Sequence, residues 1–523
     1  MNAETIPALL LQRAAEFPTL EAVVGDDERL SYAELNRRSV DRAAWLVAQG
    51  VNKGHRVALL MQNGIEWAVN AYAVMRLGAV LVPLSTLLRT PELSAQLAIA
   101  GVRHLIAMPS FRGRNYGDDI AAIDRASLPS LRNIWWSGEL GDDRTPPAQT
   151  VARALAEFVR PADDMMIIFT SGSRGLPKGV IHTHGAAIRA NAAGLADRCV
   201  RGQTRIYLPM PFFWVGGFCG GLLSALIAGA TLLTEAAPEP GQTLKFLARE
   251  RATLFRGWPD QAAHIAAHPD YPSTDLSALG PGSLDALLPS KLRSRPGSRA
   301  NLFGMTETCG PFCGYPLDQD MPEDKWGSCG RPFSGMNVRI VDAETGERLP
   351  TGEIGSIQVS GRNLMRGICG REREDVFMPD GWYDGGDLGS LDNDGFLFFT
   401  GRKDDMVKVK GATVYPSEVE AALESIAGIE RAFATGITLD GIAAIGVAII
   451  PHTAGTLTID QLQHEARERL SAFKIPSRWV ILKSIEQLPR TTTGKIDKPA
   501  LQALLLSSIS AEVGLPNRQP SRK

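Results

Sequence analysis

Residues 169–180, FTSGSRGLPKGV, form a basic, glycine-rich stretch directly after a run of β-forming residues. Glycines let backbone N–H groups converge on phosphate oxygens, and hydroxyl and ammonium groups add further donors and positive charge. The stretch therefore fits a loop that binds a polyphosphate. It is not a Walker A loop, because Lys178 is followed by Gly179 and not by Ser or Thr. Its candidate phosphate-binding residues are Thr170, Ser171, Gly172, Ser173, Arg174, Gly175 and Lys178.

By itself this loop leaves two interpretations open, a phosphate site and a structural turn. Four further segments carry polar residues at spacings that could do chemistry: LFGMTET at 302–308, GWYDGGDLG at 381–389, GRKDDMVKVKG at 401–411 and PRTTTGKIDK at 489–498. Taken one at a time, their acids and cations also fit helix caps, charged linkers and exposed loops. A carboxylate nevertheless offers two acceptors to a vicinal diol, and fixed cations lower the barrier to displacement at phosphorus.

Together the five segments resemble, in the same order along the chain, the motifs of the adenylate-forming superfamily. This superfamily includes acyl- and aryl-CoA synthetases, peptide-synthetase adenylation domains and beetle luciferases. The resemblance covers roughly residues 5–505. It implies that a carboxylate and Mg·ATP react to an acyl-adenylate and pyrophosphate, after which a nucleophile takes the acyl group and releases AMP. ATP, Mg²⁺ and coenzyme A are the cofactors that follow from it.

The resemblance assigns roles to matching residues of the first two motifs. The glycine-rich loop is expected to hold the β- and γ-phosphates of ATP. Phe303 and Gly304 are expected to line the adenine pocket, Thr306 to contact the α-phosphate and Glu307 to hold Mg²⁺.

The later motifs match residues for the ribose, the hinge and the catalytic step. Asp387 and Arg402 are expected to bind the ribose hydroxyls, and Asp404 to be the pivot between two domains. Lys495 is expected to be the catalytic residue that bridges the substrate carboxylate and the phosphate during adenylation. Its positive charge suits the negative charge that grows on the phosphate oxygens.

The second half-reaction depends on the acceptor. Lys408 matches a lysine used for thiol transfer, and Gly411 lies where the pantetheine arm of CoA is expected to pass. An ATP-dependent acid–CoA ligase is the first hypothesis, and an adenylate-forming amide synthetase or stand-alone adenylation enzyme is the alternative. A catalytically silent binding protein is a third, which the retained acids and cations of the motifs disfavour.

The predicted acyl pocket contains departures from the family pattern. Its candidate residues are Trp214, Gly216, Gly217 and Trp258. In PFFWVGG at 211–217, Trp214 stands where relatives carry His, as a gate of the acyl tunnel or as a core aromatic residue. Arg174 replaces a usual Thr or Ser, and either binds phosphate or points to solvent.

Two further features near the predicted acyl pocket are ambiguous. Arg256 in FRGWP could pair with a second carboxylate on the substrate, or extend to the surface. The segment before the second motif is shorter than in relatives. Residues 280–283 are the best candidate for the loop that relatives place there.

The elements that must position these residues follow an α/β pattern. Residues 1–160 alternate helical patterns (8–17, 31–50 and 66–79) with strand patterns (56–62, 80–84 and 104–108), which predicts a mostly parallel sheet. Segments 230–235, 252–258 and 299–304 are predicted as further buried strands, each after a helix. Residues 325–400 change to short, glycine-punctuated strands, which indicates antiparallel or barrel-like packing.

The predicted fold class is therefore α/β, with a large N-terminal domain of mostly parallel sheets flanked by helices, a small barrel-like β subdomain and a small mobile α+β C-terminal domain. The expected boundaries are 1–400 for the adenylate-forming domain, 401–405 for the hinge and 406–507 for the lid domain. Residues 508–523 are polar and contain Pro, which predicts a disordered tail.

Composition limits the partners. The 55 basic and 57 acidic residues give a net charge of −2, so we expect no nucleic-acid partner. The weakly polar run 215–234 contains five glycines and lacks cationic flanks, so we expect no integral membrane association. Six cysteines and an N-terminal segment without a basic-then-apolar leader predict a cytoplasmic protein with no disulfide. Cys309 and Cys313 lack a second ligand pair for zinc. The resemblance also implies a homodimer as one expectation.

Overall fold

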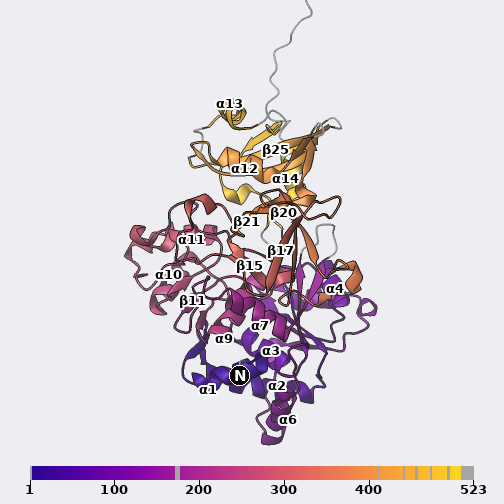
Figure 1. Ribbon diagram of the computed structural model, residues 1–523. Helices are drawn as coiled ribbons and strands as arrows, with labels where there is room; N and C mark the ends of the chain where they lie inside the picture. Colours follow the sequence, from indigo (N-terminus) through magenta and orange to yellow (C-terminus); the bar gives the residue numbers. More distant parts are fainter. Residues whose placement is uncertain are drawn as a thin grey trace, which may run out of the picture. The chain divides into compact units, whose positions relative to one another are not determined.

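The computed structural model describes residues 3–170, 177–409, 412–439, 442–453, 457–470, 474–491 and 495–507 (Figure 1). The chain divides into two units. Unit 1 comprises Met1–Arg339, Gln358–Tyr383 and Leu391–Phe398, and unit 2 comprises Ile340–Ile357, Asp384–Ser390 and Phe399–Lys523.

A seven-stranded sheet forms the centre of unit 1, in the order β19-β10-β9-β4-β3-β5-β8. Neighbours from β9 to β8 are parallel, while β10 pairs antiparallel with both β9 and β19. The sheet therefore confirms the mostly parallel arrangement predicted from the sequence. Its strands are β3 (Arg56–Leu60), β4 (Val80–Pro83), β5 (His104–Ala107), β8 (Asn133–Trp136), β9 (Asp164–Thr170), β10 (Lys178–Thr183) and β19 (Gly367–Ile368).

A five-stranded sheet, in the order β13-β11-β12-β1-β2, carries the segments around the predicted acyl pocket. Its pairs are parallel except β1 with β2. The carboxyl ends of β11, β12 and β13 therefore lie at one edge, where α/β sheets commonly bind ligands. The strands are β1 (Glu21–Val24), β2 (Arg29–Ser31), β11 (Arg205–Tyr207), β12 (Thr231–Leu233) and β13 (Leu254–Phe255).

Helices pack against these sheets. Every residue of α3 except Glu66 is buried, which is the pattern of a helix enclosed on all sides. Helix α2 begins with a capping box in which Ser31 and Glu34 satisfy each other's backbone N–H groups. The helices of unit 1 are α1 (Ile6–Glu16), α2 (Tyr32–Ala48), α3 (Ile65–Arg76), α4 (Thr90–Ile99), α5 (Tyr116–Ala121), α6 (Pro146–Glu157), α7 (His184–Ala193), α8 (Val215–Gly217), α9 (Ser224–Ala228), α10 (Pro240–Arg249) and α11 (Pro259–Ala266).

The run 215–234 folds as predicted into buried helix and strand. A π-helical turn, Phe218–Leu223, joins α8 to α9, and β12 follows. No helix in the described part of the chain is long and apolar enough to cross a membrane. All six cysteines are free thiols in the structure.

The prediction for segment 299–304 is wrong. Only its last two residues are in a strand, β14 (Phe303–Met305), which belongs to a separate antiparallel sheet with β15 (Gly310–Gly314) and β16 (Arg331–Pro332). Two 3₁₀ turns, Asp285–Leu287 and Ser290–Leu292, stand in place of the expected preceding helix. Pro289 and Pro296, on either side of the second turn, disfavour a longer helix, so the segment cannot complete a helix-then-strand unit.

The predicted change to short strands after residue 325 is confirmed. Strands β17 (Met336–Val341), β18 (Gly355–Gly361), β20 (Tyr383–Leu391) and β21 (Leu397–Arg402) form one sheet in the order β17-β18-β20-β21. The boundary between the two units falls within each of these strands.

The C-terminal part of unit 2 has its own core, built around β24, β25 and α12. Strand β25 pairs antiparallel with β24 and parallel with β26. Its helices and strands agree with the α+β composition predicted for the C-terminal domain. The elements are β22 (Val407–Val409), β23 (Ala412–Val414), α12 (Pro416–Glu424), β24 (Ile429–Leu439), β25 (Ile442–Pro451), α13 (Ile459–Arg469), β26 (Arg478–Ile481) and α14 (Lys498–Ser507).

Candidate active site

The glycine-rich loop joins two antiparallel neighbours of the seven-stranded sheet. Thr170 ends β9, Lys178 begins β10, and these two residues are register partners. The hairpin therefore brings the two ends of the loop side by side. The other predicted phosphate-binding residues, Ser171, Gly172, Ser173, Arg174 and Gly175, lie outside the described residues.

The second motif forms a tight reversal between β14 and β15. A Cβ atom on Gly304 would lie 2.3 Å from the carbonyl oxygen of Gly310, so only glycine fits there. The chain turns through a 3₁₀ segment, Thr306–Thr308, and through Cys309 at φ 59°. The Phe303 ring packs against Phe312 with 5.3 Å between centroids. The turn thus presents Thr306 and Glu307 from a closely packed base.

Two side chains from distant parts of unit 1 hold this turn. His182 Nε2 lies 2.7 Å from the Thr306 carbonyl oxygen, and the Tyr383 hydroxyl donates to Glu307 Oε1 at 3.0 Å. Burial lowers the pKa of His182 to about 4, so the neutral imidazole must donate its Nε2–H to that carbonyl. Sequence reasoning missed both contacts. The tyrosine hydroxyl within the motif GWYDGGDLG could have indicated the hydrogen bond between Tyr383 and Glu307.

Glu307 is suited to a hard cation that arrives with a phosphate. Its side chain is buried beside a threonine, and carboxylate oxygens are ligands that Mg²⁺ prefers. Among the described residues, no group of three or more His, Cys, Asp or Glu side chains could hold a metal ion. Mg²⁺ commonly binds through one or two carboxylates plus substrate phosphates, so Glu307 fits that mode.

The two predicted ribose-binding residues meet in unit 2. Arg402 Nη1, at the end of β21, lies 3.0 Å from Asp387 Oδ1 on β20. The Asp387 side chain is 10% exposed and that of Arg402 is 38% exposed. A Cβ atom on Gly386 would lie 3.2 Å from Arg402 Nη2, so the adjacent backbone fits closely under the guanidinium. The arrangement orients a mostly buried carboxylate with a charge-assisted hydrogen bond.

The other predicted residues of unit 2 lie on short segments. Asp404 is within the 3₁₀ turn Lys403–Asp405, and Lys408 is on β22, paired in register with Thr413 of β23. Gly411 lies outside the described residues. Lys495 is exposed, and its carbonyl oxygen accepts a hydrogen bond from Thr491 N at 2.8 Å. The predicted residues are therefore divided between a group in unit 1 and a group in unit 2.

The predicted acyl-pocket residues come together from two segments of unit 1. Trp214 and Trp258 are in edge-to-face contact, with 5.6 Å between ring centroids and 80° between planes. A Cβ atom on Gly217 would lie 2.1 Å from the Pro211 carbonyl oxygen, and one on Gly216 would lie 2.6 Å from Met210 Sδ. Both glycines thus allow the first turn of α8 to approach the preceding segment.

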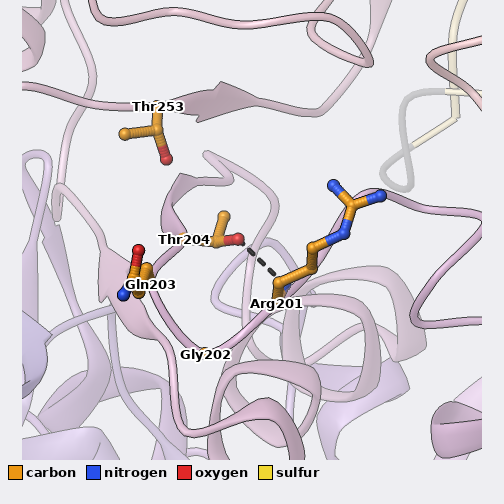
Figure 2. A pocket seen from close by; sticks show the side chains of 5 residues that line it. All are labelled: Arg201, Gly202, Gln203, Thr204 and Thr253. Atoms are coloured by element: carbon orange, nitrogen blue, oxygen red, sulfur yellow. Dashed lines mark hydrogen bonds between the residues drawn. The ribbon is translucent and has the colours of Figure 1, made fainter.

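A surface pocket of about 420 Å³ lies elsewhere in unit 1 (Figure 2). Its lining includes Thr204 and Thr253, which directly precede β11 and β13, so it borders the amino ends of these parallel strands. Arg201 N donates to Thr204 Oγ1 at 2.9 Å within it. None of the predicted site residues lines this pocket, and ligands of α/β sheets usually bind at the opposite, carboxyl ends.

The sequence model of the AMP-binding enzyme family matches residues 10–369. The chain belongs to this family. The superfamily predicted from the five motifs is thereby confirmed.

Named relatives of this AMP-binding enzyme are CoA ligases. A feruloyl-CoA synthase of an Amycolatopsis species is 33% identical over 500 residues, covering 93% of this chain and 96% of the relative. A 3-[(3aS,4S,7aS)-7a-methyl-1,5-dioxo-octahydro-1H-inden-4-yl]propanoyl:CoA ligase of Mycobacterium tuberculosis is 31% identical over 524 residues, covering 96% and 99%. The reaction class of the chain is therefore AMP-forming ligation of a carboxylic acid to coenzyme A, through an acyl-adenylate.

Solved structures of AMP-binding enzymes share the fold over nearly the whole chain. ATP-bound MatB from Rhodopseudomonas palustris superposes with a TM-score of 0.78 at 25% identity, covering 96% of this chain and 99% of that one. The o-succinylbenzoate CoA synthetase MenE from Bacillus subtilis, in complex with AMP, gives a TM-score of 0.73 at 25% identity, covering 94% and 98%. The predicted fold class is confirmed.

Proposed function

We propose that this acid–CoA ligase activates an aromatic or alicyclic carboxylic acid, and that its two units contribute different residues to the reaction. The observation that carries the proposal is the Thr306–Thr308 turn of unit 1, where a buried carboxylate is oriented by Tyr383 beside a threonine whose carbonyl is held by His182. A rigid acid next to a hydroxyl suits a site that must receive charged phosphates in one fixed position.

During adenylation, unit 1 binds the nucleotide and the acid. Thr170, Lys178 and the loop between them hold the β- and γ-phosphates, and Phe303 with Gly304 lines the adenine. Thr306 contacts the α-phosphate. Glu307 holds Mg²⁺, which when bound neutralises charge on the phosphate oxygens.

Unit 2 supplies the ribose-binding pair and the catalytic cation. Asp387 accepts hydrogen bonds from the two ribose hydroxyls, and the hydrogen bond from Arg402 orients its carboxylate. Lys495 donates to the substrate carboxylate and the α-phosphate, where negative charge increases as the acyl–phosphate bond forms and pyrophosphate leaves. Its exposed position on a turn suits a side chain that acts in only one half-reaction.

For thioester formation, we propose that Lys408 and Gly411 lie along the path of the CoA pantetheine arm. Asp404 is the pivot between a domain of residues 1–400 and a lid domain of residues 406–507, with 401–405 as the hinge. The CoA thiol attacks the acyl carbon, the acyl–phosphate bond breaks and AMP leaves. The six free cysteines also fit a reducing compartment such as the cytoplasm.

The substrate class is supported by the acyl-pocket residues and by the relatives' names. Trp214 and Trp258 offer apolar ring surfaces that suit a flat or cyclic acyl group. The feruloyl- and indenylpropanoyl-CoA ligases are both more than 30% identical to the chain. The long-chain-fatty-acid–CoA ligase FadD13 of M. tuberculosis is 29% identical to the chain. Fatty acids are therefore the substrates against which ring-containing acids should be compared.

Carboxylate-dependent pyrophosphate release with Mg·ATP tests the proposal. The panel contains aromatic, alicyclic, dicarboxylic and fatty acids, each with and without CoA, with Lys495→Ala as the control. We expect release with ring-containing acids that requires Lys495 and is accelerated by CoA. Faster turnover of unbranched fatty acids would contradict the substrate class. Acceleration by amines but not by CoA would contradict the acceptor.

A further inference from the structure

Arg256 is a partly buried cation without a carboxylate partner in the described part of the chain. It directly follows β13 at the carboxyl end of the five-stranded sheet and is partly buried. Its guanidinium makes one hydrogen bond, from Nη1 to the Gly282 carbonyl oxygen at 2.9 Å. No ion pair joins Arg256 to an acid among the described residues. A guanidinium has five donors, so most of its capacity is not used by these contacts.

Among the residues that the structure describes, no negatively charged side chain compensates the charge of Arg256. Burial lowers its pKa, and the one group that favours the cation is the Cys199 thiol, whose own pKa is raised by burial so that it stays neutral near pH 7. Arg198 lies close enough to disfavour a second positive charge. Burying a charge without a partner costs free energy, which a bound anion would offset.

Arg198 differs from Arg256 in how its donors are used. Arg198 donates to the carbonyl oxygens of Gly194 and Asn191 and to Ser224 Oγ, so all three nitrogens of its guanidinium donate a hydrogen bond within unit 1. Arg256 therefore has the greater capacity to bind a ligand. The Arg256 side chain turns toward the carbonyl of Gly282 and keeps part of its surface exposed.

Arg256 is also placed at the end of the sheet where the acid is expected. Gly257, at φ 146°, separates it from Trp258, which contacts Trp214. The loop 280–283 lies against the same strand, because Gly280 N donates to Thr253 O at 2.9 Å and Phe255 N donates to Ser283 Oγ at 3.1 Å. Arg256 thus lies between this loop and the segment of the two tryptophans.

We propose that Arg256 binds a second carboxylate, at the end of the acid remote from the carboxyl group that is adenylated. This inference rests on the proposed function and adds a specificity residue to it. A planar guanidinium fits a carboxylate through two parallel N–H···O bonds, which gives orientation as well as affinity. Such a site would favour ring-containing dicarboxylic acids over monocarboxylic acids of the same size.

Matched substrates test the proposal. Alicyclic and aromatic dicarboxylic acids are compared with their own monomethyl esters, which keep the size and one carboxylate, by initial rates of pyrophosphate release. We expect the wild type to prefer the best diacid over its half-ester by about 100-fold in kcat/KM. In Arg256→Met the preference falls to within about 3-fold, and Arg256→Lys retains part of it because the charge remains.

Controls separate recognition from structure. Arg201→Met removes an exposed arginine of the same unit, and its diacid preference is expected to equal that of the wild type. If Arg256→Met lowers the rates for diacid and half-ester equally, Arg256 only supports the Gly282 loop, and the proposal is wrong. It is also wrong if the wild type uses half-esters as well as diacids. Absence of pyrophosphate release with every acid would instead overturn the proposed function itself.

Discussion

The turn at Thr306–Thr308 in unit 1 and the turn at Lys495 in unit 2 both carry residues assigned to adenylation, but they are held very differently. The first is fixed by two side-chain hydrogen bonds from His182 and Tyr383, and Glu307 is buried. At the second, the Lys495 carbonyl oxygen accepts hydrogen bonds from the backbone N–H and the hydroxyl of Thr491, and the Lys495 side chain is exposed. The residues proposed to receive the phosphates are therefore fixed by side-chain contacts, while the lysine proposed to act on the developing charge has an exposed side chain.

The largest effect is expected from removing the exposed lysine. Lys495→Ala should lower the rate of ATP–pyrophosphate exchange by about 10³-fold, because a fixed cation at the α-phosphate is lost. The free energy of unfolding in urea should change by less than about 0.5 kcal/mol, as for other exposed side chains. Lys483→Ala, at another exposed lysine of unit 2, is the matched control and should leave both quantities unchanged. A large loss of stability in Lys495→Ala would make its role structural.

The buried acid should give the next effect. Glu307→Gln should lower exchange by about 100-fold, since a neutral amide is a poor partner for Mg²⁺. Tyr383→Phe should lower it by about 10-fold through the loss of one buried hydrogen bond. Because Tyr383 acts through Glu307, the double variant should be within about 2-fold of Glu307→Gln. Fully additive losses would show that Tyr383 has a role independent of Glu307.

The ribose pair should affect affinity more than turnover. Asp387→Ala should raise the KM for ATP about 30-fold, and Arg402→Ala about 10-fold, because the arginine orients the carboxylate without replacing it. The KM for 2′,3′-dideoxy-ATP, which lacks both hydroxyls, should change less than 3-fold in either variant. An equal rise in KM for both nucleotides would place Asp387 away from the ribose.

The smallest effect on activity is expected from titration of His182. Its pKa of about 4 keeps the imidazole neutral above pH 5, so adenylation should not follow this group there. Stability should follow it, because the unfolded chain binds the proton first as the pH falls below 6.5. The contribution of His182, up to about 3 kcal/mol, is present above pH 6.5 and lost toward pH 4.

Urea unfolding at several pH values measures this loss. His182→Gln, which keeps an N–H donor, should flatten the dependence between pH 6.5 and 4. It should not abolish the dependence, because burial also lowers the pKa of His104 to about 4 and that of His184 to about 3. An unchanged slope in His182→Gln would show that His182 binds a proton equally well in the folded and the unfolded protein.

The sequence predicted elements whose patterns are local. Strands β3, β4 and β5 and helices α2 and α3 follow from hydrophobic period and length, and the sequence motifs were enough to find the superfamily. The prediction for segment 299–304 was wrong because its apolar residues suggested a strand buried in the main sheet. In the structure, β14 pairs with β15, which follows it closely in the sequence, and the two strands belong to a separate antiparallel sheet. Local composition does not distinguish these two kinds of pairing.

Contacts between residues that are far apart in the sequence could not be predicted from it. His182 and Thr306 are separated by 124 positions, and Tyr383 and Glu307 by 76, so no spacing rule joins them. Gly304 was assigned to the adenine pocket, but the structure adds a packing requirement, because the Gly310 carbonyl occupies the space of a Cβ atom. Such requirements arise from three-dimensional proximity.

Strand β10 has a mechanical consequence for the site. Lys178 at its first position and His182 four residues later are on the same face of the strand, about 13 Å apart at the usual rise per residue. Hydrogen bonds to β9 and β19 stiffen the strand between them. One continuous strand therefore joins the end of the glycine-rich loop to the imidazole that contacts the Thr306 carbonyl, so both segments proposed to bind the nucleotide are anchored on the same strand.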